Sequence, residues 1–216
     1  EGADPILWPE QVADWWADGL RVVSLTHYGV SSYAHGTGTA GGLTPQAPAL
    51  LRAMAQVGMI LDLTHLADES FWQALAIFDG PVLASHQNCR ALVRGERQFS
   101  DDQLRAIIAR GGVIGASMDT WMLYNDGKLD WAKAGITNRR AVFPRQAVTL
   151  AHVADHIDHV CQLAGNADHA AIGGDTDGQG GADGAPAEVD TVADYQQLAA
   201  ILAGRGYDSL AIEKIM

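Results

Sequence analysis

The sequence has little cysteine and few basic residues for its acidic content. Its two cysteines, Cys89 and Cys161, lie far apart and form no CxxC pair, which excludes a disulfide framework and a thiolate metal cluster. Lys and Arg number 14 against 26 Asp and Glu, giving a formal net charge of −12. Nucleic acids and anionic membranes are bound through clustered basic residues, so neither is expected as a partner.

Long apolar runs and several common catalytic motifs are also absent. No run approaches the ~20 apolar residues that cross a bilayer, and no signal peptide opens the chain. We therefore expect no membrane segment. The location is otherwise open, and this segment alone favours a soluble, cytoplasmic protein. There is no HExxH, P-loop or GxSxG, which excludes the commonest signatures of other hydrolases and of nucleotide-binding proteins.

What the chain does contain is an alternation of short apolar runs and amphipathic helices. The runs are apolar through most of their length, which predicts buried parallel strands. The predicted strands are 20–25, 59–63, 81–85, 113–117 and 170–174. The predicted helices are 10–18, 45–57 (with Thr44 as N-cap), 68–78, 100–110 (with Ser100 as N-cap), 147–164, 192–203 and one that begins near Asp208.

Helices that alternate with strands predict an α/β fold with a parallel sheet, either doubly wound or closed into a barrel. Four polar residues follow directly after predicted strands: His27, His65, His86 and Asp175. In a (β/α)8 barrel of the TIM type, that edge carries the active site. A doubly wound sheet usually has a glycine-rich phosphate turn after its first strand, and none is present. We predict one catalytic barrel domain over residues 1–216.

The segments LDLTH and VLASH end at His65 and His86, one βα unit apart. Adjacent strands would then present two imidazoles side by side, and neutral imidazole is a common ligand of zinc. The alternative is that either histidine is only hydrogen-bonded in the core or at the surface. Two histidines at matched strand ends favour a metal site.

The phrases EGADPI, VVSLTH, GGLTP, ILDLTH, VLASHQNCRAL, SDDQL and AIGGDTDG occur here in the order typical of one family. By these phrases the chain resembles the membrane (renal) dipeptidase family of the amidohydrolase superfamily, over essentially its whole length. The resemblance implies a binuclear metal-dependent hydrolase with two Zn²⁺ ions that cleaves dipeptides.

The resemblance also implies a role for each candidate site residue. Glu1 would bridge the two metals, and His65 and His86 would complete the ligands of one. His27 would face the substrate, and Asp175 would handle protons, as a general acid–base residue does. Arg97 would bind the substrate carboxylate, for which its planar guanidinium is suited; without the resemblance, Arg97 would be interpreted as a solvated surface residue.

Two alternatives to a dipeptidase stay open. The first is another amidohydrolase reaction, on an N-acyl amino acid, a cyclic amide or a lactone. The second is a non-catalytic homologue that binds a small ligand or a metal. The expected partner is a small peptide substrate, and a homodimer is left open.

The family carries a His-x-Asp pair at the end of its first strand, and no such pair precedes Glu1. On the resemblance, Glu1 ends the third strand. We therefore expect a segment of a longer chain that lacks the first two barrel strands and most of the third, and that also ends early.

Two further features of the sequence each have two possible interpretations. His152, His156 and His159 share one face of a predicted helix, but they precede a strand, which favours a polar helix surface and packing over a metal site. The stretch 118–144 contains Trp121, Tyr124 and Trp131 and is long for a loop. It is interpreted as a lid or substrate wall, with a contact to a neighbouring subunit nearly as well favoured.

Overall fold

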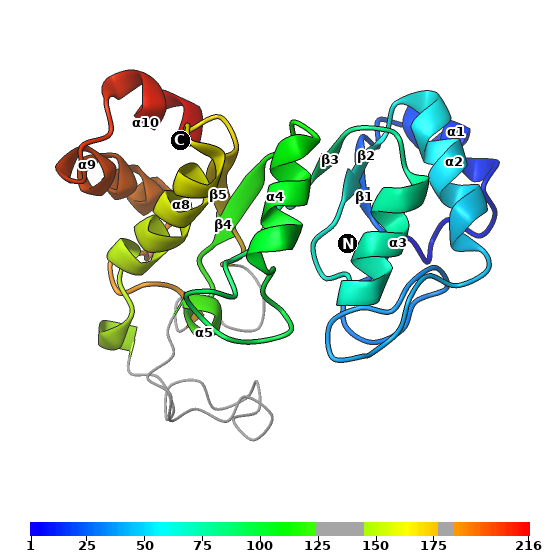
Figure 1. Ribbon diagram of the computed structural model, residues 1–216, viewed down its shortest axis with the longest axis horizontal. Coiled ribbons are helices and arrows are strands. Elements are labelled where there is room, and N and C mark those ends of the chain that lie inside the picture. The colour runs from blue at the N-terminus through cyan, green and yellow to red at the C-terminus, as the bar shows by residue number, and fades with distance from the viewer. Residues whose placement is uncertain (124–144, 177–183) are drawn as a thin grey trace. The chain divides into compact units, whose positions relative to one another are not determined.

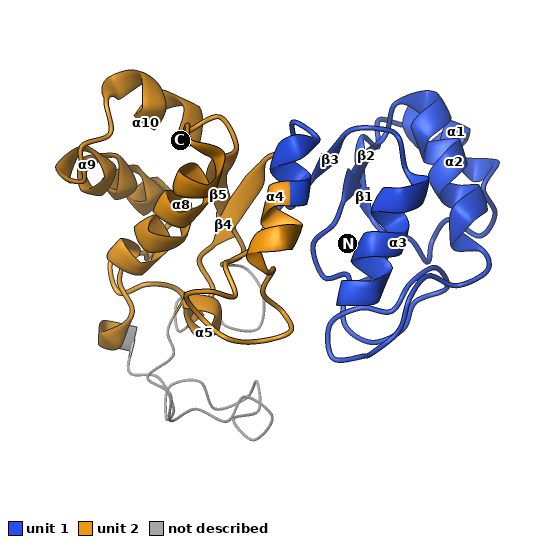
Figure 2. Ribbon diagram, viewed as in Figure 1, with its two compact units in different colours: residues 1–85, 106–112 blue, residues 86–105, 113–216 orange. Residues whose placement is uncertain are grey.

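The computed structural model describes residues 1–123, 145–176 and 184–216 (Figure 1). The chain forms two compact units, residues 1–85 with 106–112, and residues 86–105 with 113–216 (Figure 2). The division crosses helix α4 (Asp101–Ala109) and falls at the peptide bond between Ser85 and His86. The single catalytic domain over residues 1–216 stays a prediction.

The first unit contains a parallel sheet in the order β1-β2-β3. Its apolar face packs against α2, whose Leu50, Leu51 and Met54 are fully buried. Helix α2 packs on β2, and α3 packs on α2. The elements of this unit are α1 (Gln11–Ala17), β1 (Val22–Ser24), α2 (Ala47–Val57), β2 (Ile60–Asp62), α3 (Asp68–Ile77) and β3 (Val82–Leu83).

The second unit contains a parallel pair, β4 and β5, in which Ile114 pairs with Ala170. The buried face of α8, which includes Val153 and Ile157, packs on this pair. The predicted helix 192–203 is divided into a 3-10 turn and an α-helix. The remaining elements are β4 (Ile114–Ser117), α5 (Thr120–Leu123), η2 (Arg145–Ala147), α8 (Leu150–Ala164), β5 (Ala170–Gly174), η4 (Val192–Gln196), α9 (Gln197–Gly204) and α10 (Ser209–Ile215).

Helix boundaries follow local hydrogen bonding. The predicted cap of α4 is confirmed, since the amide of Gln103 donates to Ser100 Oγ at 3.4 Å and the amide of Ser100 donates to Gln103 Oε1 at 2.9 Å. The predicted cap of α2 is wrong. Gln46 is its N-cap, because the hydroxyl of Thr44 instead donates to the carbonyl of Ser32.

The predicted α/β class is confirmed, and all the strand pairs of the described ranges are parallel. No helix in these ranges is long and apolar enough to cross a membrane. Of the aromatic residues in the 118–144 stretch, Trp121 belongs to α5, whereas Tyr124 and Trp131 lie outside the described residues.

Candidate metal centre

The register of the first sheet aligns three histidines. Ser24 pairs with Asp62, and Asp62 pairs with Leu83. His27, His65 and His86 each follow one of these paired residues by three positions (24 to 27, 62 to 65 and 83 to 86). The carboxyl ends of parallel strands point the same way, so this register places the turns that carry His27 and His65 side by side in the first unit.

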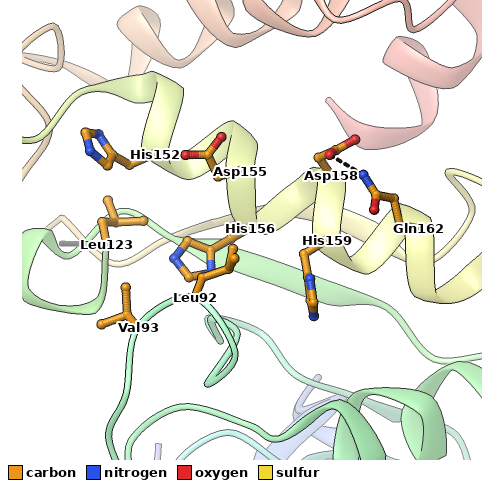
Figure 3. Close-up of a pocket in the computed structure, with 9 residues that line it drawn as sticks. All are labelled: Leu92, Val93, Leu123, His152, Asp155, His156, Asp158, His159 and Gln162. Atoms are coloured by element: carbon orange, nitrogen blue, oxygen red, sulfur yellow. Dashed lines mark hydrogen bonds between the residues drawn. The ribbon is translucent and has the colours of Figure 1, made fainter. Parts of the chain in front are cut away.

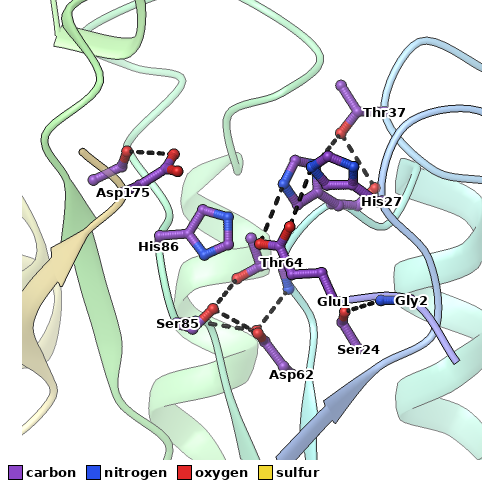
Figure 4. A network of polar contacts seen from close by, with 12 residues as sticks. Glu1, Gly2, Ser24, His27, Thr37, Asp62, Thr64, Ser85, His86 and Asp175 are labelled. Carbon is purple, nitrogen blue, oxygen red and sulfur yellow. Dashed lines mark hydrogen bonds and ion pairs between the residues drawn. The ribbon is translucent and has the colours of Figure 1, made fainter. Parts of the chain in front are cut away.

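Glu1 lies beside the first of these turns (Figure 4). Its neighbour Gly2 donates its amide to Ser24 Oγ at 3.0 Å, and the amide of Ala3 donates to the carbonyl of Leu25 at 3.3 Å. The Glu1 carboxylate is then 3.1 Å from His27 Nε2 and 3.8 Å from His65 Nε2. The two imidazole rings are 4.3 Å apart between centroids.

In the part of the chain that the structure describes, one group of three side chains is arranged to supply metal ligands. It consists of Glu1, His65 and His86, and one ligand atom from each lies within 4.8 Å of the others. His65 and His86 are buried, with 4% and 7% of their surfaces exposed. Two imidazoles and a carboxylate form a normal zinc ligand set that leaves coordination positions open.

The backbone is strained at two predicted site residues. Among the described residues other than glycine, only His65 and Asp175 have φ in the left-handed region, at +70° and +68°. That conformation costs about 1–3 kcal/mol in a residue with a Cβ and persists only where its surroundings hold it. Asp175 directly follows β5 and His65 lies three residues beyond the end of β2, so the strain occurs where the sequence predicts function.

Asp62 is a supporting residue that the sequence analysis missed. Its Oδ1 accepts hydrogen bonds at 3.0 Å from the amides of both Thr64 and Ser85, and its Oδ2 accepts from Ser85 Oγ at 2.5 Å (Figure 4). Thr64 and Ser85 immediately precede His65 and His86. One buried carboxylate therefore joins the two turns that carry the predicted ligands. A charged residue inside the apolar run MILDL was the signal for it.

Arg97 is held against the backbone of a predicted ligand. Its Nη2 donates to the carbonyl of His86 at 3.0 Å, and its Nη1 donates to Gln87 Oε1 at 2.7 Å. Gln87 in turn donates from Nε2 to the carbonyl of Arg97 at 2.7 Å. These bonds place the guanidinium beside the turn that contains His86, and Gln87 is a second supporting residue that the sequence analysis did not single out.

The segment after His86 is fixed to β4 by side-chain hydrogen bonds. Asn88, fully buried, donates from Nδ2 to the carbonyl of Ser117 and accepts from the amide of Ser117, at 3.1 and 3.0 Å. The hydroxyl of Ser117 donates to Asp175 Oδ2 at 3.3 Å. Asp175 follows β5, so the end of β4 orients this predicted acid–base carboxylate.

The three histidines of α8 line a cavity whose lining does not include the grouped candidate ligands, and each contacts a different partner (Figure 3). His156 is buried, and its Nδ1 accepts a hydrogen bond from the amide of Cys89 at 3.0 Å. Burial, together with the neighbouring His159 and His152, lowers the pKa of His156 to about 3. His159 Nε2 contacts Asp101 at 2.8 Å, and His152 Nδ1 accepts from the amide of Thr149 at 3.1 Å. The cavity that they line has a volume of about 490 Å³.

The sequence and the fold were compared with known proteins. A profile of the family described as membrane dipeptidase (peptidase family M19) matches residues 1–216. The chain is 30% identical over 205 residues to Dipeptidase tcpJ of Claviceps purpurea, covering 92% of this chain and 42% of that protein. It is also 30% identical over 178 residues to an uncharacterized protein of Klebsiella pneumoniae, covering 82% of this chain and 58% of that one.

The fold is also similar to that of solved structures. A metallo peptidase from Rhodobacter sphaeroides, liganded with a phosphinate mimic of the dipeptide L-Ala-D-Ala, superposes with a TM-score of 0.79 and 25% identity. The match covers 95% of this chain and 55% of that one. The chain therefore spans about half the length of these relatives. Since the family profile matches the chain from end to end, the chain belongs to the membrane dipeptidase family, peptidase family M19.

Proposed function

We propose that the complete protein is a zinc-dependent dipeptidase that hydrolyses the amide bond of dipeptides with a free C-terminal carboxylate. The observation that carries this proposal is the grouping of Glu1, His65 and His86, with ligand atoms within 4.8 Å of one another, in a chain of the dipeptidase family. A relative named a dipeptidase and a solved relative bound to a dipeptide mimic support the substrate class.

The donor set fits zinc. Two imidazoles and one carboxylate form a mixed nitrogen and oxygen ligand set that zinc, a borderline-soft ion, accepts, whereas calcium and magnesium favour sites built only of oxygen. We assign Glu1, His65 and His86 as the residues that would hold the metal. When bound, the zinc would supply a nucleophile at neutral pH and polarise the scissile carbonyl.

The other site residues act on the substrate. His27, half-exposed and in contact with Glu1, is proposed to donate a hydrogen bond to the carbonyl oxygen as negative charge develops on it. Asp175 is proposed to carry a proton to the departing amine. Arg97 is proposed to bind the terminal carboxylate, which excludes substrates that extend more than one residue beyond the scissile bond on its C-terminal side.

We further propose that the parallel strands belong to a (β/α)8 barrel in the complete protein. The parallel pairing of β1, β2 and β3, and the histidines that follow these strands, support this architecture. A homodimer and a cytoplasmic location remain predictions from the sequence.

The test is a substrate panel with the complete protein. Initial rates are measured on free dipeptides, their C-terminal amides, tripeptides, N-acyl amino acids, cyclic amides and lactones, with zinc supplied and after removal of metal by a chelator. We expect zinc-dependent cleavage of free dipeptides above all other classes. Preferred hydrolysis of another class would instead establish a different amidohydrolase reaction. Zinc binding without any hydrolysis would indicate a non-catalytic homologue.

A further inference from the structure

The side chain of Thr37 contacts the metal-binding histidine of the proposed site. Its Oγ1 lies 2.9 Å from His65 Nδ1 and 3.3 Å from the carbonyl oxygen of His65. Thr37 and His65 are both buried, with 9% and 4% of their surfaces exposed. Neither contact is at the surface, so water does not readily replace them.

Together the two contacts favour a proton on Nδ1 of His65. A hydroxyl has one hydrogen to donate, and a carbonyl oxygen can only accept. Both contacts are satisfied when Thr37 donates to the carbonyl of His65 and accepts from Nδ1–H of the same residue. A neutral imidazole protonated at Nδ1 has its lone pair on Nε2. Nε2 is the atom that faces the Glu1 carboxylate at 3.8 Å.

The position of Thr37 is itself fixed by backbone hydrogen bonds. Its amide donates to the carbonyl of His27 at 3.1 Å, and its carbonyl accepts from the amide of Gly29 at 2.9 Å. The same residue thus holds the backbone of one site histidine and the ring of another. The two contacts of the Thr37 hydroxyl also help to explain how His65 keeps its left-handed backbone conformation, because they hold both the ring and the carbonyl of His65.

We infer that Thr37 is a positioning residue that holds His65 in the tautomer and orientation that bind the metal through Nε2. Histidine ligands in metal sites usually donate their second nitrogen to a fixed partner, and loss of that partner typically lowers metal affinity by about 10–100-fold. The inference rests on the proposed function, since the tautomer of His65 affects metal binding only if His65 is a ligand.

The test compares zinc affinity, measured by chelator competition, in the complete wild-type protein and three variants. Thr37→Val keeps the shape of the side chain but removes the hydroxyl, whereas Thr37→Ser keeps the hydroxyl. Thr39→Val is the matched control, because the Thr39 hydroxyl bonds to the carbonyl of Gly36 at 2.8 Å in the same loop. We expect affinity to fall about 10–100-fold in Thr37→Val and to stay near the wild-type value in the other two.

A second readout needs no substitution. Nitrogen-15 NMR of the metal-free wild-type protein reports the tautomer of His65, and we expect a proton on Nδ1. A proton on Nε2, unchanged zinc affinity in Thr37→Val, or equal losses in the Val and Ser variants would each overturn the inference. His65→Ala separates this failure from failure of the proposed function: undiminished zinc binding in His65→Ala would contradict the ligand assignment itself.

Discussion

Replacement of Asp62 by alanine should destabilise the protein and weaken its metal site together. The buried carboxylate accepts three hydrogen bonds, from the amides of Thr64 and Ser85 and from the hydroxyl of Ser85. Alanine cannot accept any of them. Depriving a buried donor of its acceptor costs about 1–3 kcal/mol. Two backbone amides and one hydroxyl, which is free to turn elsewhere, give a combined loss of about 2–6 kcal/mol.

That loss is a large fraction of the 5–15 kcal/mol by which most domains are stable. Asp62→Asn is the conservative control, because an amide oxygen can still accept from the two backbone amides, and about 1 kcal/mol should be lost. The assay is urea denaturation of the complete protein, followed by circular dichroism, with zinc affinity measured in parallel. Both variants should retain the same m-value, since the surface exposed on unfolding does not change.

The reasoning fails if Asp62→Ala loses less than about 1 kcal/mol, the value of an ordinary hydrogen bond. It also fails if Asp62→Asn is as unstable as Asp62→Ala. A loss of stability with unchanged zinc affinity would show that Asp62 supports the sheet but does not orient the turns that contain His65 and His86.

Three further predictions concern the site and its surroundings. His65→Ala and His86→Ala should each lower zinc content measured by atomic emission, since each removes a ligand, whereas His152→Gln should not; wild-type content in both alanine variants would refute the assignment. Arg97→Met should weaken binding of free dipeptides by about 2–5 kcal/mol more than binding of their amides, and equal losses for both would make Arg97 structural. The pKa of His156 is lowered to about 3 in the folded protein, so below pH ~6.5 the unfolded chain takes up a proton there and the folded chain does not. This difference should lower the free energy of unfolding by about 1.4 kcal/mol per pH unit as the pH falls toward 3. His156→Gln should show a shallower pH slope of unfolding free energy, and an identical slope would exclude His156 as its source.

The strands were the most predictable part of the fold. Each predicted run contains the observed strand. Buried parallel strands are short, continuous apolar segments, and this pattern differs from the periodic apolar pattern of an amphipathic helix. Helix starts were less predictable where a side chain had competing partners. Thr44 has the ordinary properties of an N-cap, yet its hydroxyl bonds to Ser32, twelve residues away, and that contact is not visible in the local sequence.

The sequence predicted the candidate metal ligands but not the residues that hold those ligands in place. His65 and His86 were found because they end matched strands, and Glu1 was found only through the family phrases. Thr37 and Gln87 carried no comparable signal, since a threonine in a loop and a glutamine after a strand are common. Their roles depend on contacts that form only when the turns come together.

The polar groups at the strand ends of the first unit accept hydrogen bonds from backbone amides and also orient the proposed metal ligands. Where a strand ends, its next amides lose their ladder partners and need other acceptors. Here Asp62 accepts from the amides of Thr64 and Ser85, the residues that precede both buried histidines. These bonds satisfy the backbone and orient the proposed ligands at once. Metal binding to the folded state should therefore add to the stability of the same turns, because a ligand that binds only the folded protein shifts the unfolding equilibrium in its favour. Substitution of a supporting residue should weaken fold and site in the same measurement, whereas loss of a ligand alone should affect chiefly the stability gained from the metal.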